Sequence, residues 1–300
     1  MTASAPPVEP AGDTATGDRR RGWRRRPRHV VVSVATYAAA ILVALFALAP
    51  LYWMVLTSIK PAAEVRTAEP VFWPSEVVLT RYVDVIQRGF FGYLTNSLIV
   101  ALTVTVLGVA FAAFAGYALA RFDLSIKRYL LLLVLATQMF PMVVLIIPLF
   151  TVMRNLELLD TYTGLIVTYL SFSTPLAVWI LRGFFQSIPA ELEDAALVDG
   201  CTRFKALTRI VLPLAGPGLA ACSIFVFIGA WNEFLFALTF ISQDSMRTLP
   251  VALQAFTGRS GIDFGAVMAF STLFTLPAVA FFLLVHRRLS TGMVSGAVKG

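Results

Sequence analysis

The sequence is poor in the residues from which catalytic and metal sites are built. Its 300 residues include two cysteines, two histidines and 17 acidic residues, and 14% of the chain is charged. Cys201 and Cys222 have no metal-ligand spacing around them and are not expected to pair. His29 and His286 each stand at the end of an apolar run, which leaves little for a histidine-based centre. We therefore expect no metal site and no catalytic residues.

A phosphate-binding loop is also absent from the sequence. None of the four lysines, Lys60, Lys127, Lys205 and Lys299, ends a G-x-x-x-x-G-K-[ST] run. The chain is therefore expected to bind no cofactor and to hydrolyse no ATP. If it takes part in active transport, another subunit has to supply the energy.

Apolar residues are abundant. They make up 58% of the chain, and the mean hydropathy is +0.79, more than a soluble domain can bury. A helix needs about 20 residues to cross the ~30 Å hydrocarbon core. Six runs meet this length, at residues 30–56, 94–120, 129–153, 163–181, 214–241 and 264–285. The sequence predicts an all-α polytopic membrane protein with six transmembrane helices between residues 30 and 289.

The basic residues predict how the chain is oriented. Residues 1–29 combine an Ala-, Pro-, Thr- and Gly-rich segment with seven arginines, and we expect a disordered cytoplasmic tail rather than a signal peptide or a nucleic-acid arm. With this tail inside, 17 of the 24 lysines and arginines fall in inner segments and 7 in outer ones. The positive-inside rule then places both termini, the tail at 290–300 and residues 188–213 in the cytoplasm.

Residues 188–213 form the longest polar interruption in the second half of the chain. Glu191 and the acids after it suit the start of a short helix, which we expect to end near Val198. Asp199-Gly200 reads as a turn in which Gly200 takes a positive φ. Thr202 is placed to cap a second short helix. A helix-turn-helix between membrane spans has the shape of a docking element for a soluble partner.

Within the spans, two local patterns predict how helices pack and bend. Gly108, Ala112 and Gly116 recur every four residues, which lets helix backbones approach closely. Five prolines are expected to bend or interrupt their helices: Pro50, Pro141, Pro148, Pro175 and Pro277.

The polar stretch resembles a known motif. The run Asp194-Ala195-Ala196-x-x-Asp199-Gly200, with Phe204 and Leu212-Pro213-x-x-x-Pro217 after it, is similar to the EAA loop of ABC importer permeases. Asp194 departs from the family's usual Glu, and Cys201 from its usual Ala or Ser. Four further segments resemble carbohydrate importer permeases, most closely the second permease of maltose and multiple-sugar importers: Pro50-Leu51-Tyr52-Trp53, Asn96-Ser97, Trp231-Asn232-Glu233 and Ser295-Gly296-Ala297-Val298-Lys299-Gly300.

The resemblance implies a type I ABC importer permease fold in a bacterial inner membrane. It implies a heterodimer with a sister permease, two ATPase subunits that carry ATP and Mg, and an extracytoplasmic solute-binding protein. It also implies that the tail at 290–300 reaches the ATPases and that the loop at 242–263 enters the binding protein's cleft. By the same resemblance, coupling to the ATPases falls to Glu191, Asp194, Ala195, Ala196, Asp199, Gly200, Phe204 and Pro213.

Glu233 is the acid placed deepest inside a predicted span. A carboxylate there is costly unless it faces a cavity or another helix. One interpretation makes Trp231, Asn232 and Glu233 the wall of a sugar path, with Trp231 stacking on the sugar and Gln138 as a weaker candidate. The other makes Glu233 an interhelical hydrogen-bond partner at a subunit interface. A rival function is an ion-coupled secondary transporter that uses Glu233, but we find no internal inverted repeat. A membrane-embedded enzyme lacks a catalytic cluster.

Overall fold

The computed structural model describes residues 27–67, 69–256 and 263–293, and over these ranges it is helical with no β-strand. The predicted tail at 1–26, the tip of the loop at 257–262 and the end of the chain from 294 lie outside the described residues. By its internal contacts the chain separates after Leu51 into two units. The first contains the apolar beginning of helix α1 (Pro27–Ile59), and the second contains the rest of the chain.

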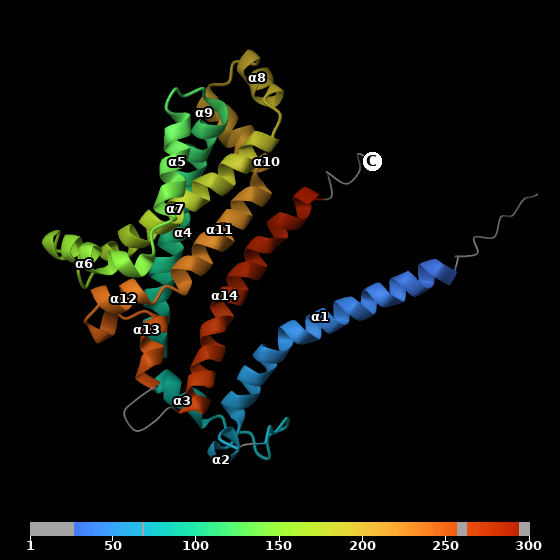
Figure 1. Cartoon of the computed structure of the whole chain (residues 1–300), viewed down its shortest axis with the longest axis vertical. Helices are drawn as coiled ribbons and strands as arrows, with labels where there is room; N and C mark the ends of the chain where they lie inside the picture. Colours follow the sequence, from blue (N-terminus) through green and yellow to red (C-terminus); the bar gives the residue numbers. More distant parts are fainter. Residues whose placement is uncertain (1–26, 68, 257–262, 294–300) are drawn as a thin grey trace, which may run out of the picture. The chain divides into compact units, whose positions relative to one another are not determined.

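Four helices are long and apolar enough to cross a membrane without a break: α1, α4 (Phe90–Arg121), α7 (Tyr162–Ser187) and α14 (Phe264–Met293). They correspond to the first, second, fourth and sixth predicted spans (Figure 1). The other two spans are built from shorter pieces. Counting each bent helix pair as one span gives up to six among the described residues, as the sequence predicts.

The third predicted span is sharply bent. Helix α5 (Lys127–Thr137) ends before Pro141, and the chain continues through the 3₁₀ turn η1 (Met142–Leu145) into α6 (Ile146–Asn155). The two arms meet at 90°, so α6 runs across the direction of α5 (Figure 1). Pro141 cannot donate a backbone hydrogen bond and disfavours a helical residue before it, so it ends α5.

The fifth predicted span is also discontinuous, whereas the sequence pattern treated residues 214–241 as one run. The structure gives α11 (Gly216–Trp231), a non-helical step at residues 232–234 and then α12 (Leu235–Phe240). The helical segment before α11 meets it at 78°. The pattern missed the step because no proline marks it. Pro50, Pro175 and Pro277 lie inside helices that continue through them, so these three do not interrupt their spans.

Helices α4 and α7 pack closely along much of their lengths, as the small-residue repeat predicts. A Cβ added to Gly116 would lie 3.1 Å from the backbone nitrogen of Arg182 and 3.2 Å from the carbonyl oxygen of Val178. One added to Gly108 would touch side chains of both α7 and α11. Because lipid supplies no hydrophobic drive for helix association, this close approach is what holds the pair together.

Helix α11 belongs to two packed clusters. One face, with Cys222 and Val226, packs with α4, α7 and α12, and the other, with Phe227 and Trp231, packs with α4 and α14. The remaining helical pieces connect and cap these elements: α2 (Ala62–Val65), α3 (Thr80–Gln87), α8 (Glu191–Val198), α9 (Arg203–Ala206), the π-helical turn η2 (Leu207–Val211), α10 (Leu212–Leu214), η3 (Asp244–Met246), α13 (Leu249–Leu253) and η4 (Gln254–Phe256).

Candidate functional site

Residues 188–213, called here the docking loop, form the predicted helix-turn-helix. Helix α8 has the predicted bounds and carries acids in its first turn. Gly200 has φ +84°, and a Cβ added to it would meet no atom within 4 Å, so the glycine is needed for its backbone conformation alone. The hydroxyl of Thr202 accepts a hydrogen bond from the backbone nitrogen of Lys205 at 3.3 Å and caps α9, as predicted.

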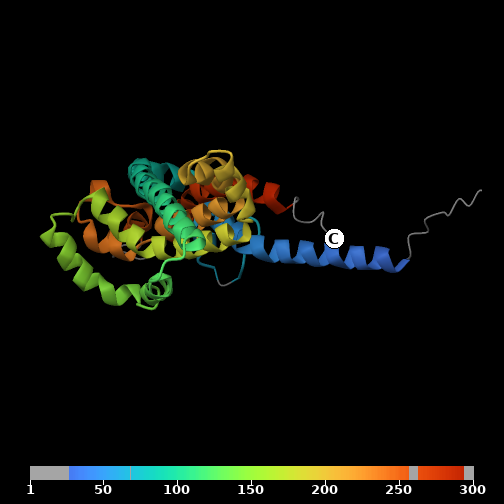
Figure 2. The ribbon, with the colours of Figure 1, turned by 90° about the horizontal axis from the view of Figure 1, so that it is seen from above.

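The docking loop lies at one end of the bundle, at the top of Figure 1, and Figure 2 looks onto that end. The loop leaves apolar side chains exposed. Val198 is 88% exposed, Phe204 63% and Leu192 45%. Of the predicted coupling residues, Glu191, Asp194, Ala195, Asp199, Gly200, Phe204 and Pro213 are exposed and Ala196 is buried. The loop therefore offers an apolar surface edged by acids, of the kind that a protein partner can cover.

A buried carboxylate anchors the docking loop to α4. Glu193 is 5% exposed and accepts a hydrogen bond from the hydroxyl of Tyr117 at 2.8 Å. Its other oxygen pairs with Nε of Arg121, and Nη2 of Arg121 donates to the carbonyl of Ile188 at 2.8 Å. Sequence reasoning assigned Glu193 only to the helix dipole. Its partners lie 72 and 76 residues earlier, so no local pattern could reveal them.

Aromatic contacts hold the second helix of the loop to the same end of α4. The ring of Phe204 lies parallel to that of Phe114, with centroids 6.5 Å apart. The guanidinium of Arg203 lies 5.4 Å from the ring of Phe122. Both helices of the docking loop are thus fastened to the C-terminal end of α4.

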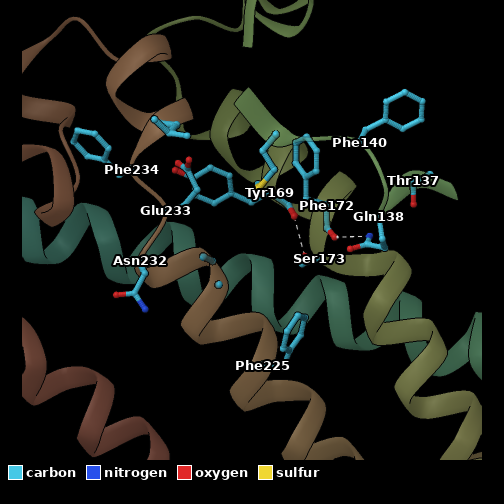
Figure 3. Close-up of a pocket in the computed structure, with 14 residues that line it drawn as sticks. Thr137, Gln138, Phe140, Tyr169, Phe172, Ser173, Phe225, Asn232, Glu233 and Phe234 are labelled. Carbon is cyan, nitrogen blue, oxygen red and sulfur yellow. Dashed lines mark hydrogen bonds between the residues drawn. The ribbon is translucent and has the colours of Figure 1, made fainter. Parts of the chain in front are cut away.

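A cavity of about 500 Å³ lies between the end of α5, the middle of α7 and the step between α11 and α12. Figure 3 shows its aromatic and polar wall. Fourteen residues line it: Thr137, Gln138, Phe140, Met142, Tyr169, Phe172, Ser173, Phe225, Gly229, Ala230, Asn232, Glu233, Phe234 and Leu235. The cavity therefore contains three of the four predicted substrate-path residues and sits where two spans are broken.

Glu233 acts as a helix cap. Its Oε1 accepts a hydrogen bond from the backbone nitrogen of Phe236 at 2.8 Å, and its Oε2 accepts one from Ala237 at 3.1 Å. The charge is thus balanced by the amides and the positive dipole end of α12. This is a contact within the chain, which neither interpretation of Glu233 from the sequence included. The polar pair Asn232-Glu233, one residue before the start of α12 at Leu235, was the available signal for a helix start.

Trp231 does not line the cavity, contrary to the expectation that its ring would face a sugar. It is 2% exposed, and its ring stacks on Phe227 and Phe274, each with centroids 5.4 Å away. Trp231 is the last residue of α11, and Glu233 lies in the non-helical step that follows it, so the two side chains do not share a helix face. Glu233 can therefore face the cavity while Trp231 faces α14.

Tyr169, which the sequence pattern did not single out, supplies a buried polar atom to the cavity wall. It is 4% exposed, and its hydroxyl has no hydrogen-bond partner among the described residues. Figure 3 shows it between Glu233 and Phe172. The amide of Gln138 donates to the carbonyl of Phe172 at 3.3 Å, across the gap between α5 and α7. Tyrosines on apolar helices are common, so sequence alone gave no reason to choose this one.

At the opposite end from the docking loop, a hydrogen-bonded network fixes the segment after α12. Asn96 donates to the carbonyls of Ser245 and Arg247 at 2.8 and 2.9 Å and accepts from the hydroxyl of Tyr162 at 2.7 Å. The hydroxyl of Ser97 accepts from the backbone nitrogen of Leu249 at 2.8 Å. The Asn96-Ser97 pair thus fixes the first part of the loop at 242–263, which was expected to meet a binding protein.

Asp160, in the loop between α6 and α7, hydrogen-bonds to the segment that follows α12. Its Oδ1 accepts hydrogen bonds from the backbone nitrogens of Ser242 at 2.6 Å and Gln243 at 3.0 Å, and its own nitrogen donates to Phe240 at 2.9 Å. The amides of Gln243 and Ser242 lower the pKa of the Asp160 carboxyl from its ordinary value of 3.8. Across residues 27–67, 69–256 and 263–293, no group of three or more His, Cys, Asp or Glu side chains could hold a metal ion.

Comparison with known proteins identifies the family. The chain is 40% identical to the trehalose transport system permease protein SugB of Mycobacterium tuberculosis over 271 residues, which cover 89% of this chain and 98% of that protein. It is 37% identical over 266 residues to the sulfoquinovosyl glycerol transport system permease protein SmoH of Agrobacterium fabrum, covering 88% and 93%. A permease chain from a bacterial ABC transporter that imports the acidic polysaccharide alginate has the same fold, with a TM-score of 0.71 and 23% identity over 89% of this chain and 99% of that one.

The matches extend over the docking loop, the cavity and the last span. Residues 105–295 match the family described as the binding-protein-dependent transport system inner membrane component. This is a family of transport subunits rather than enzymes, which agrees with the predicted fold and with the EAA loop. The chain is a multi-pass inner-membrane protein and belongs to this family of ABC importer permeases.

Proposed function

We propose that this chain is one membrane half of an ATP-driven importer of di- or oligosaccharides. The main observation that supports this proposal is the cavity between α5, α7 and α11. Its volume of about 500 Å³ falls in the range of small-molecule sites, and it lies at two broken helices, where transporters commonly bind solutes. The two relatives compared above are named for sugar or sugar-glycoside transport.

The chemistry of the cavity wall suits an uncharged sugar. Four phenylalanines, Phe140, Phe172, Phe225 and Phe234, offer apolar faces for stacking, and Gln138, Tyr169 and Asn232 offer polar groups. None of the fourteen described residues that line it is basic. A sugar that carries a phosphate would enter without a counter-charge and next to Glu233, which is unfavourable. The Tyr169 hydroxyl is buried in this wall beside Glu233.

The partners in this proposal follow from the family. A sister permease completes the channel, two ATPase subunits bind ATP and Mg²⁺ and dock on residues 188–213, and a solute-binding protein meets the opposite end. The exposed apolar residues of the docking loop support the position of the ATPases. The coupling residues predicted from the EAA loop keep that role in the proposal: Glu191, Asp194, Ala195, Ala196, Asp199, Gly200, Phe204 and Pro213.

The proposed orientation places residues 1–29, residues 290–300 and the docking loop in the cytoplasm. It rests on the distribution of basic residues, 17 inside and 7 outside. The segment at 242–263 then faces the binding protein, with its base held by Asn96 and Ser97. The tail at 290–300 is proposed to reach the ATPases.

The contacts of Glu193 suggest how movement is passed on. ATPase closure displaces α8, and the buried pair between Glu193 and Arg121 carries the displacement to α4. Because α4 packs closely on α7 at Gly116, and α7 supplies Tyr169 and Phe172, movement at the docking loop reshapes the cavity. Ion coupling through Glu233 is not favoured, since both of its oxygens accept backbone hydrogen bonds and the family is one of ABC importers.

Substrate protection of introduced cysteines tests the site. In a transporter complex with Cys201→Ser and Cys222→Ala, a cysteine at Gln138 should be labelled by a small thiol reagent, and trehalose or maltose should slow that labelling. A cysteine at Thr151, exposed on α6 and outside the cavity, is the matched control. Equal labelling of Gln138→Cys with and without each sugar, in a complex that transports that sugar, would contradict this site.

A further inference from the structure

A second groove is lined by residues of α5, α7 and the turn before α5. Figure 1 shows α5 and α7 approaching the docking-loop end of the bundle. The volume of the groove is about 540 Å³. Nine residues line it: Leu124, Ser125, Lys127, Arg128, Leu131, Leu132, Leu135, Trp179 and Arg182. None of them lines the sugar cavity, and the groove has a different chemistry.

Three cations converge on the groove. Lys127 and Arg128 enter from the first turn of α5, and Arg182 enters from α7. No acidic residue is among the nine described residues that line it. Two acids lie nearby: Asp123 is exposed in the turn before α5, and Glu193 is engaged by Arg121. The charge of the groove is therefore strongly positive.

The start of α5 adds to this positive charge. Its N-cap residue, Ile126, makes no side-chain hydrogen bond to the helix, and the first turn contains no acid. A helix N-terminus carries a partial positive charge and prefers an anion, yet here it carries Lys127 and Arg128. Within the described residues, neither the N-cap nor the first turn of α5 supplies a carboxylate.

Arg182 is held in place beside the groove with part of its guanidinium unsatisfied. Its Nε is buried and has no hydrogen-bond partner among the described residues. The guanidinium lies 5.6 Å from the ring of Trp179, and the backbone of Arg182 is packed against Gly116 of α4. A buried donor without a partner is costly, and an anion in the groove would satisfy it.

The rest of the groove is apolar and runs along α5 away from the cations. Leu132 is 53% exposed and Leu135 44% exposed. From Lys127 to Leu135 a helix rises about 12 Å, enough for a headgroup and the first part of an acyl chain. A free anion would use the cations but would leave these leucines uncovered.

We propose that this groove binds an anionic phospholipid, with its phosphate on Lys127, Arg128 and Arg182 and an acyl chain along Leu131, Leu132 and Leu135. Basic pockets between transmembrane helices on the cytoplasmic side suit such headgroups. Assigning the lipid to the inner leaflet rests on the proposed orientation and not on the identity of the sugar. The leucine wall and the cluster of charge favour lipid over a sugar or a polar protein surface.

Native mass spectrometry of the whole transporter complex tests the proposal. The complex is extracted from vesicles of phosphatidylcholine that contain phosphatidylglycerol, and retained lipids are counted. We expect the parent to retain phosphatidylglycerol in preference to phosphatidylcholine. Arg182→Gln and the double variant Lys127→Gln/Arg128→Gln should weaken retention by about fivefold for each charge removed. Arg154→Gln, which removes an exposed cation from the end of α6, is the matched control and should have no effect.

Four results would overturn the proposal. The first is unchanged phosphatidylglycerol retention in both basic-residue variants, and the second is equal retention of the two lipids by the parent. The third is displacement of the lipid by inorganic phosphate alone. The fourth is disulfide cross-linking of Leu132→Cys to the sister permease, which would mean that protein fills the groove. The Lys127/Arg128 pair lies at the start of α5, so its replacement tests the site even if Arg182→Gln fails to assemble. These outcomes are independent of sugar uptake and so do not depend on the proposed substrate.

Discussion

The hydroxyl of Tyr117 donates a hydrogen bond at 2.8 Å to the buried carboxylate of Glu193, and so ties the C-terminal end of α4 to the docking loop. Arg121, one turn further along α4, pairs with the other oxygen of the same carboxylate. The loop is therefore fixed to the bundle through one acid, while its apolar side chains remain exposed for a partner.

Replacing Glu193 by Ala should loosen the docking loop and uncouple the transporter. Removing one member of a buried ion pair costs about 3–5 kcal/mol, because the other charge is left unpaired. We expect a lower unfolding temperature of the purified complex and a loss of ATPase stimulation by sugar-loaded binding protein. Glu191→Ala, exposed on the same helix, should leave the unfolding temperature unchanged. Equal effects of the two substitutions on the unfolding temperature would show that the Glu193 pair is not the anchor.

Gly200 should be sensitive to substitution for a backbone reason alone. Its φ of +84° costs other residues about 1 kcal/mol or more, although space for a Cβ is open. Gly200→Ala should therefore impair docking and coupling, and Gly200→Val should do so more strongly. Gly183 has the same open space without a positive φ, and it lies within α7, so Gly183→Ala should be neutral or stabilising. ATPase retention during purification and sugar-stimulated ATP hydrolysis are the measurements. If Gly200→Val shows the same sugar-stimulated ATP hydrolysis as the parent, the docking loop does not couple the ATPases to transport.

The parts of this fold that depend on local sequence could be predicted. Apolar run length predicted the membrane helices, and Pro141 predicted the bend after α5. The Asp199-Gly200 turn and the Thr202 cap predicted the docking loop. Each of these signals lies within a few residues of the feature that it predicts.

The parts that depend on distant contacts could not be predicted. Glu193 finds its partners on α4, and the unpartnered hydroxyl of Tyr169 depends on how α7 faces α11. The burial of Trp231 was missed because a helix had been assumed to continue through Asn232. The step there turns Glu233 toward the cavity and leaves Trp231 packed on Phe274.

Asp160 should make the loops at the end opposite the docking loop sensitive to acid. Its carboxyl has a lower pKa in the folded protein than the ordinary value of 3.8, so its stabilising effect is present above that value and is lost as the pH falls through the folded pKa. At neutral pH, Asp160→Ala should cost about 1 kcal/mol, seen as about fivefold faster hydrogen exchange of the Ser242 and Gln243 amides. Below the folded pKa, the difference between parent and variant should shrink to the cost of placing Ala at the φ of 54° that Asp160 adopts. Asp123→Ala, at an exposed acid near α5, is the control. A difference that persists unchanged in strong acid would contradict this role.

Gly265→Ala should disturb the end of α1. A Cβ there would lie 2.1 Å from the guanidinium carbon of Arg81, which is 8% exposed and donates to the carbonyl of Lys60 at 2.6 Å. Arg81 also reaches the carbonyls of Thr57 and Ser58, and so caps the last turn of α1. Overpacking of this kind costs about 1–3 kcal/mol. Thermal unfolding should show the loss, whereas Gly92→Ala, which meets no atom within 4 Å, should not. Equal stability of the two variants would mean that Arg81 can move without cost.

Sugar uptake into proteoliposomes tests the central claim most directly. The complete transporter is reconstituted with ATP inside, loaded binding protein outside and no ion gradient, and radiolabelled trehalose or maltose is followed in the parent and in Glu233→Gln. We predict uptake that requires both ATP and the binding protein, and substantial uptake by Glu233→Gln, because the amide oxygen can still accept one of the backbone hydrogen bonds that start α12. Uptake driven by a proton gradient without ATP, and abolished by Glu233→Gln, would contradict the account.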